Sequence, residues 1–206
     1  MMETAIRLEE FSDMEKLYSL IDNWSKSTGM SAVIVDMEGN RTSESFGMTE
    51  FCQMIHASDQ GADICASTWK DNKQGIYECP MGFFDFSIPI LLPDGTQIGR
   101  VMAGQALLDE QNEAEIIKKI RCLDINEAKY TDILSRIHKK TRKEMESAYA
   151  LLNQILFAFV EKSYNYWQAK KELENSPTTQ DKILSQITQI LYSYNITVNL
   201  ETGNIP

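Results

Sequence analysis

A hairpin predicted between residues 79 and 105 constrains the fold more than any other feature of the chain. Residues 86–92 form an apolar run, Pro93-Asp94-Gly95 follows, and residues 97–103 form a second apolar run. Pro and Gly supply the backbone dihedrals that a chain reversal needs, so the pattern predicts two antiparallel strands. Four apolar side chains recur at every second position of the first strand: Phe84, Phe86, Ile88 and Ile90. Such a face can fill a core or line a pocket for a small apolar ligand.

The residues before this hairpin predict a helix, a smaller hairpin and a helical insert. Apolar residues recur at steps of three and four over residues 7–27, which is typical of an amphipathic helix. Residues 30–36 read as a buried strand, and residues 41–46 as its partner after a turn at Gly39. Residues 49–74 are polar with helical spacing.

Composition bounds the size and the partners of the protein. A chain of 206 residues with 43% hydrophobic content can bury one substantial core with a helical extension. A net charge of -10 argues against nucleic acid or an anionic membrane surface as the partner. The N-terminus shows no apolar signal region, and the longest apolar run, residues 148–160, is too short to span a bilayer. We therefore expect a cytoplasmic chain with no membrane contact by this segment.

A set of short motifs lies along the first 105 residues: Ser27-Thr28-Gly29-Met30 with the strand running on to Gly39, Phe51-Cys52, Ile64-Cys65, Cys79-x-x-Gly82-x-x-Asp85, Ile88-Pro89-Ile90, Ile98-Gly99 and Ala103-Gly104-Gln105. Through these motifs the chain resembles the PocR sensory domain, a PAS-like ligand-binding module of bacterial signalling proteins. The resemblance covers roughly residues 8–165, and one departure is Pro80, which stands where the family often has His after the third cysteine.

The predicted fold class is α/β in the α+β sense: a PAS-like antiparallel sheet with a helical insert, an N-terminal helix and a long C-terminal signalling helix. We expect residues 1–142 to form the sensory domain and residues 143–175 the signalling helix. Two shorter helices are predicted over residues 109–122 and 125–137. Residues 176–206 read as a linker and the start of a further, truncated domain.

The expected function is the binding of a small, mostly apolar molecule. The resemblance implies hydrocarbon derivatives such as short diols, and an effector of the diguanylate cyclase or histidine kinase type further along the chain. No cofactor is required. The predicted ligand-binding residues are Cys52, His56, Cys65, Trp69, Tyr77, Cys79, Met81, Phe84, Phe86, Ile88, Met102 and Gln105. Gln105 stands out because a buried amide that ends an apolar strand needs a hydrogen-bonding partner.

Two alternatives use the cysteines. A metal or redox sensor would use Cys52, Cys65 and Cys79 to hold a metal ion or an iron-sulfur cluster. Their separations of 13 and 14 positions, however, lack the close pairs typical of zinc sites. A thiol-dependent enzyme would use Cys52 with His56, which shares its helix face, as the base. No oxyanion-binding motif accompanies this pair, so we do not expect this fragment to be an enzyme. Buried thiols that pack as small hydrophobes explain the same residues.

The long C-terminal helix carries an apolar stripe that needs to be covered. Its members are Met145, Tyr149, Leu152, Leu156, Phe159 and Tyr166. The stripe either packs on the helix's own domain or meets a second copy. We expect a homodimer in which Phe159 and Tyr166 meet their counterparts.

Overall fold

The computed structural model describes residues 6–71, 73–123, 125–175, 182–184 and 186–187. The chain divides into two units, Met1–Ser163 and Tyr164–Pro206, and the sheet lies in the first. Residues 182–184 and 186–187 are helical. The rest of the segment 176–206, which was predicted to be a linker and the start of a further domain, lies outside the described residues. No described helix has the combined length and apolar character that a membrane crossing requires.

Four antiparallel strands form the sheet, in the order β1-β4-β3-β2. They are β1 (Ser31–Val35), β2 (Gly75–Glu78), β3 (Phe84–Leu91) and β4 (Gln97–Ala106). The predicted hairpin is confirmed as β3 and β4. Its turn is closed by the Leu92 N–H, which donates to the Thr96 carbonyl at 2.9 Å, and Gly95 takes a φ of 87° that favours glycine.

Residues 41–46 were predicted as a strand, but the structure pairs them with β1 at only two isolated bridges. Ala32 pairs with Phe46, and Val35 pairs with Arg41. Between these bridges the Ile34 N–H donates to the Ser43 Oγ at 2.9 Å, so a side-chain oxygen replaces the backbone carbonyl of a regular ladder. The segment still lies beside β1, as the second strand of a PAS-like sheet would. The α+β, PAS-like fold class is confirmed.

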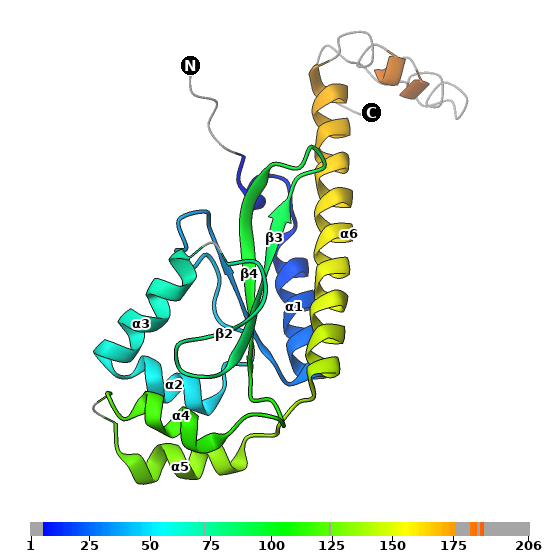
Figure 1. Ribbon diagram of the computed structural model, residues 1–206. Coiled ribbons are helices and arrows are strands. Elements are labelled where there is room, and N and C mark those ends of the chain that lie inside the picture. Colours follow the sequence, from blue (N-terminus) through cyan, green and yellow to red (C-terminus); the bar gives the residue numbers. More distant parts are fainter. Residues whose placement is uncertain (1–5, 72, 124, 176–181, 185, 188–206) are drawn as a thin grey trace, which may run out of the picture. The chain divides into compact units, whose positions relative to one another are not determined.

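Helix α1 (Met14–Thr28) and the part of α6 (Arg142–Asn175) that belongs to the first unit lie together on one side of the sheet (Figure 1). The predicted N-terminal helix begins later than expected because the Asp13 side chain caps it by accepting from the Lys16 N–H. The residues ahead of that cap include a short 3-10 helix, η1 (Leu8–Glu10). Gly29, with a φ of 67°, ends α1.

The first half of α6 packs on its own unit. Met145, Leu152 and Leu156 are buried, and Phe159 is half-buried. The predicted stripe is therefore covered here by the sheet and α1, which is one of the two arrangements that the spacing allowed. Phe157, outside the predicted stripe, is 60% exposed.

A second core forms where the helical insert meets the two helices that follow β4. The insert contains α2 (Glu50–His56) and α3 (Asp59–Lys70), and the later pair is α4 (Glu113–Ile120) and α5 (Glu127–Arg136), as predicted. Phe51 of α2 stacks on Phe83 with ring centroids 4.3 Å apart at the centre of this core. In Figure 1, α2, α4 and α5 gather at one end of the sheet, while α3 lies on the side opposite α1 and α6.

Candidate functional site

The two faces of the sheet differ in what covers them. Successive side chains of a strand point to opposite faces, so Phe86, Ile88 and Ile90 share one face of β3. Phe86 makes edge-to-face ring contacts with Trp24 of α1, at 6.0 Å between centroids, and with Tyr149 of α6, at 5.4 Å. We call this side, which α1 and α6 cover, the helix face. The opposite side, which α3 covers, is the insert face.

The insert face combines a small apolar cluster with polar side chains. Val33, Val35 and Met102 are buried together, with Trp69 of α3 and Tyr77 of β2 packed against them. Strand pairing adds polar neighbours, because Tyr77 lies opposite Asp85, and Ser87 lies opposite Met102. The face thus carries a carboxyl and two hydroxyls beside apolar surface.

A cavity of about 30 Å³ lies on this face. Its apolar lining comes from Val33, Met48, Trp69 and Met102, and its polar lining from Ser31, Ser45, Asp85 and Gln105. The volume is enough for about two water molecules. It is the mixture of lining groups, rather than the size, that makes this cavity the candidate ligand site.

A bulge in β4 brings Asp85 and Gln105 together. The pairing shifts between Phe84 and Phe86, so that Gly104 and Gln105 both lie opposite Asp85. Gly104 has a φ of 132°, and a Cβ there would lie 2.6 Å from the Asp85 Cα. Gln105 has a φ of 55°, which is rare for a residue other than glycine. Its N–H donates to the Asp85 Oδ1 at 2.7 Å.

The Gln105 side chain holds the start of the insert. Its Oε1 accepts from the Thr49 N–H at 2.9 Å and from the Thr49 hydroxyl at 3.1 Å, and Thr49 in turn caps α2. The predicted partner of this buried amide is thus the protein's own insert. At the other end, the Arg100 Nη2 donates to the Trp69 carbonyl in the last turn of α3, at 2.6 Å. Strand β4 therefore anchors both ends of the insert.

Burial sets the electrostatics of Asp85. Removal from water disfavours the charged form and raises the pKa of this carboxyl to about 7, offset only in part by the hydrogen bond from the Gln105 N–H. Asp85 is half-buried, and it borders the cavity. A carboxyl that titrates near neutrality in a cavity is typical of functional sites.

Four of the predicted site residues lie on the insert face. Trp69, Met102 and Gln105 border the cavity, and Tyr77 packs beside it. His56 lies next to this group, because its ring centroid is 5.7 Å from that of Trp69. Burial, followed by the charge of Arg41, lowers the pKa of His56.

The structure places the other predicted site residues elsewhere. Met81 is buried in the second core, and Cys52, Cys65 and Cys79 pack against it. Phe84 lies under the Arg142 guanidinium, 5.3 Å from its ring centroid. Phe86 and Ile88 point to the helix face and are fully buried. None of these seven side chains borders the cavity.

The thiols of Cys52, Cys65 and Cys79 are close enough to influence one another but are poor nucleophiles. Burial raises the pKa of Cys52 and Cys79 well above the usual range and that of Cys65 to about 11, and the Asp85 charge raises all three further. The reactive thiolate is therefore scarce at neutral pH. Among the residues with described positions, no group of three or more His, Cys, Asp or Glu side chains is arranged to hold a metal ion.

Sequence reasoning missed Asp85, Ser87 and the small residues of the cavity wall. Asp85 appears in the motif that carries the family resemblance, and it is an acidic residue inside an apolar alternation, which is an available signal. Ser31 and Ser45 carry no such signal. They reach the site through the pairing of distant segments.

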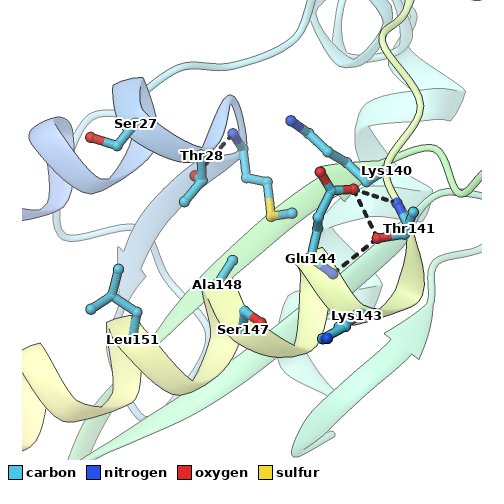
Figure 2. Close-up of a pocket in the computed structure, with 10 residues that line it drawn as sticks. Ser27, Thr28, Lys140, Thr141, Lys143, Glu144, Ser147, Ala148 and Leu151 are labelled. Carbon is cyan, nitrogen blue, oxygen red and sulfur yellow. Dashed lines mark hydrogen bonds between the residues drawn. The ribbon is translucent and has the colours of Figure 1, made fainter.

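A larger hollow, of about 420 Å³, lies between the end of α1 and the start of α6 (Figure 2). Two of its lining residues are bonded to each other: the Thr141 N–H and hydroxyl both donate to the Glu144 carboxylate, at 2.7 and 2.9 Å. On the α1 side the Met30 N–H donates to the Thr28 hydroxyl at 3.3 Å. These bonds cap and join helix ends, so we do not take this hollow as the ligand site.

Comparison with known proteins supports a sensory role. A model of the sensory domain found in PocR matches residues 10–164. The regulatory protein PocR of Salmonella typhimurium (strain LT2) is 30% identical over 111 residues, which are 50% of this chain and 36% of that relative. The match thus spans little more than a third of the relative's length. No solved structure matches the chain. The family match covers most of the first unit, including both faces of the sheet, and the chain belongs to the family of PocR sensory domains.

Proposed function

We propose that this domain senses a small, mostly apolar molecule, such as a short diol, in the cavity on the insert face. The observation that carries the proposal is the mixed lining of that cavity, where apolar side chains and the Asp85 carboxyl meet. The family membership supports a ligand-sensing role. The domain acts in the cytoplasm, where the free state of the described cysteines is the usual one. Nucleic acid is not its partner.

The proposed relay crosses the sheet at Phe86. This residue lies between Asp85 and Ser87 of the insert face and contacts Tyr149 of α6 on the helix face. The Trp24 Nε1–H also donates to the Ala148 carbonyl of α6, at 3.1 Å. A ligand that binds one arrangement of β3 and the insert better than another would bias α6 by that difference in affinity. The signal then passes along residues 143–175 to an effector of the diguanylate cyclase or histidine kinase type.

The relay is completed by a homodimer. Leu91 and Phe157 are 40% and 60% exposed and border the same small hollow between the hairpin and α6. Exposed apolar groups of this kind are typical of protein contacts. We therefore propose Phe157, in place of the half-buried Phe159, as the centre of the contact, with Tyr166 further along the helix.

Ligand titration tests the sensing proposal. A panel of short diols, alcohols, aldehydes and acids is added to the protein, and thermal unfolding is measured together with tryptophan fluorescence. At a hundredfold excess over its dissociation constant, a ligand should stabilise the fold by about 2.7 kcal/mol. Because Trp69 borders the cavity, the fluorescence change should be lost in Trp69→Phe while the thermal shift is kept. A panel in which no compound stabilises the protein would contradict the proposal.

A further inference from the structure

The insert face holds hydrogen-bonding groups that the described protein atoms leave unused. Tyr77 and Asp85 are directly paired across β2 and β3, and Ser87 lies two residues further along on the same face. The Tyr77 Oη and the Ser87 Oγ are buried and have no hydrogen-bond partner among the residues that the structure describes. A buried hydroxyl without a partner costs about 1–3 kcal/mol, so two on one face require an explanation.

Asp85 has spare capacity as well. Within the described part of the chain its carboxyl accepts one hydrogen bond, from the Gln105 N–H to Oδ1, whereas a carboxylate offers about four acceptor positions. No neighbouring cation is among the causes that set its pKa, which burial raises to about 7. The Asp85 carboxyl therefore borders the cavity with an oxygen that can accept another donor.

The three groups together describe the ligand chemistry they would recognise. A hydroxyl group can donate to Asp85 and accept from Tyr77 or Ser87, so it satisfies both kinds of partner. A carboxylate ligand would place a second negative charge beside Asp85. An ammonium group can donate to Asp85 but has no lone pair with which to accept from the Tyr77 or Ser87 hydroxyl. The hydrocarbon part of a ligand would pack on Val33 and Met102.

We propose that Asp85 is the recognition group of the sensory cavity, and that with the Tyr77 and Ser87 hydroxyls it selects a short aliphatic ligand by its hydroxyl groups. This inference rests on the proposed sensing function and gives it a specific chemistry. The cavity of about 30 Å³ is too small for a three-carbon ligand, so binding requires Trp69 or the insert to move as the ligand enters.

The test is a calorimetric titration with a matched series of three-carbon compounds, at pH 8: propane-1,2-diol, propan-1-ol, propylamine and propanoate. The wild-type protein should bind the diol most tightly and propanoate at least tenfold more weakly. Asp85→Asn keeps the shape and an oxygen for the Gln105 N–H, and should weaken diol binding at least tenfold. The matched control is Asp63→Asn on the exposed side of α3, which should bind the diol as the wild type does.

Tyr77→Phe and Ser87→Ala provide an independent test if Asp85→Asn does not fold, because each removes one oxygen and little else. Each substitution should weaken the binding of the diol threefold or more and should affect the binding of propan-1-ol less. If Asp85→Asn, or both hydroxyl variants, bind the diol as tightly as the wild type does, the recognition role is wrong while the sensing function stands. Tightest wild-type binding of propylamine or propanoate would overturn the hydroxyl selectivity alone. If the wild type binds none of the series nor of the broader panel, the sensing function itself fails.

Discussion

The two faces of the sheet are built from alternate residues of the same strands, yet they are packed in opposite ways. On the helix face, Phe86 and Ile88 are fully buried and Phe86 is held between aromatic rings of α1 and α6. On the insert face, position 85 holds a carboxyl that borders the cavity, and position 87 holds a buried hydroxyl. The first face has the features of a close-packed core, and the second retains polar groups that a core would exclude.

This contrast indicates that the helix face of β3 contributes mainly to stability and its insert face mainly to recognition. A side chain on the helix face contributes by burial and shape, and its loss leaves a void. Polar groups on the insert face reduce stability unless something satisfies them, which is the condition that a ligand can meet. The following predictions test this division, from the largest expected effect to the smallest.

Substitutions at two adjacent positions of β3 should differ most in their effect on the free energy of unfolding. Phe86→Ala removes a fully buried ring and should lower the free energy of unfolding by about 3–5 kcal/mol, as measured by urea denaturation. Its control is the next residue: Ser87→Ala removes a buried hydroxyl that has no partner in the described structure and should change the free energy by less than about 1 kcal/mol, or raise it. Equal losses in the two variants would show that both faces are structural cores.

The Asp85 carboxyl should make the protein less stable as the pH rises. Its folded-state pKa of about 7 lies above the unfolded value of 3.8, so the folded protein holds the proton more tightly. Its contribution is therefore most favourable below about pH 4 and is lost as the pH rises to 7, by up to about 4 kcal/mol. Denaturation of the wild type and of Asp85→Asn from pH 4.5 to 8 measures this difference.

Other groups that face Asp85 should not obscure that trend. The pKa values of Cys52, Cys65, Cys79 and Tyr77 are raised, so these groups stay neutral across the range. The lowered pKa of His56 gives an opposite slope, which both proteins share and which the difference removes. Parallel stability profiles for the two proteins would contradict a buried carboxyl that titrates near neutrality.

Loss of the Gln105 side chain, which anchors the insert, should have an intermediate effect on stability. Gln105→Ala leaves the Thr49 N–H without its partner and should cost about 1–3 kcal/mol, with faster amide hydrogen exchange at Thr49 and Cys52. The control is Gln53→Ala, which loses an exposed hydrogen bond to the Met48 carbonyl and should cost less than about 0.5 kcal/mol. Unchanged exchange in Gln105→Ala would mean that β4 does not hold the insert.

The outer side of α6 should matter for association rather than for stability. Phe157→Glu at this exposed position should change the free energy of unfolding by less than about 0.5 kcal/mol while it shifts the protein from dimer to monomer in analytical ultracentrifugation. Lys162→Glu, an exposed position elsewhere on the helix, should leave the dimer intact. If the wild type sediments as a monomer at high concentration, the proposed dimer is wrong.

The sequence predicted the elements better than it predicted the site. The Pro-Asp-Gly turn and the helical spacings act locally, so the β3–β4 hairpin and the helices followed from them. The period of two in β3 showed that Phe86 and Ile88 share a face, but not that α1 and α6 would cover it. The cavity could not be predicted because it joins β1, α3 and the β4 bulge, and their proximity is a property of the fold.

The β4 bulge also bears on which changes of chain length the domain can tolerate. Its extra residue inverts the phase of the side chains that follow, so Ala106 pairs with Phe84 and Gln105 meets Thr49 only because the strand contains that residue. Deleting Gly104 or Gln105 would leave Ala106 opposite Phe84 in a regular ladder and would remove the bulged position that brings Gln105 to Thr49. A hairpin transplanted into this domain would therefore need the bulge as well as the strands. Differences in loop length between related domains should occur at the Leu92–Thr96 turn rather than at the other end of the hairpin.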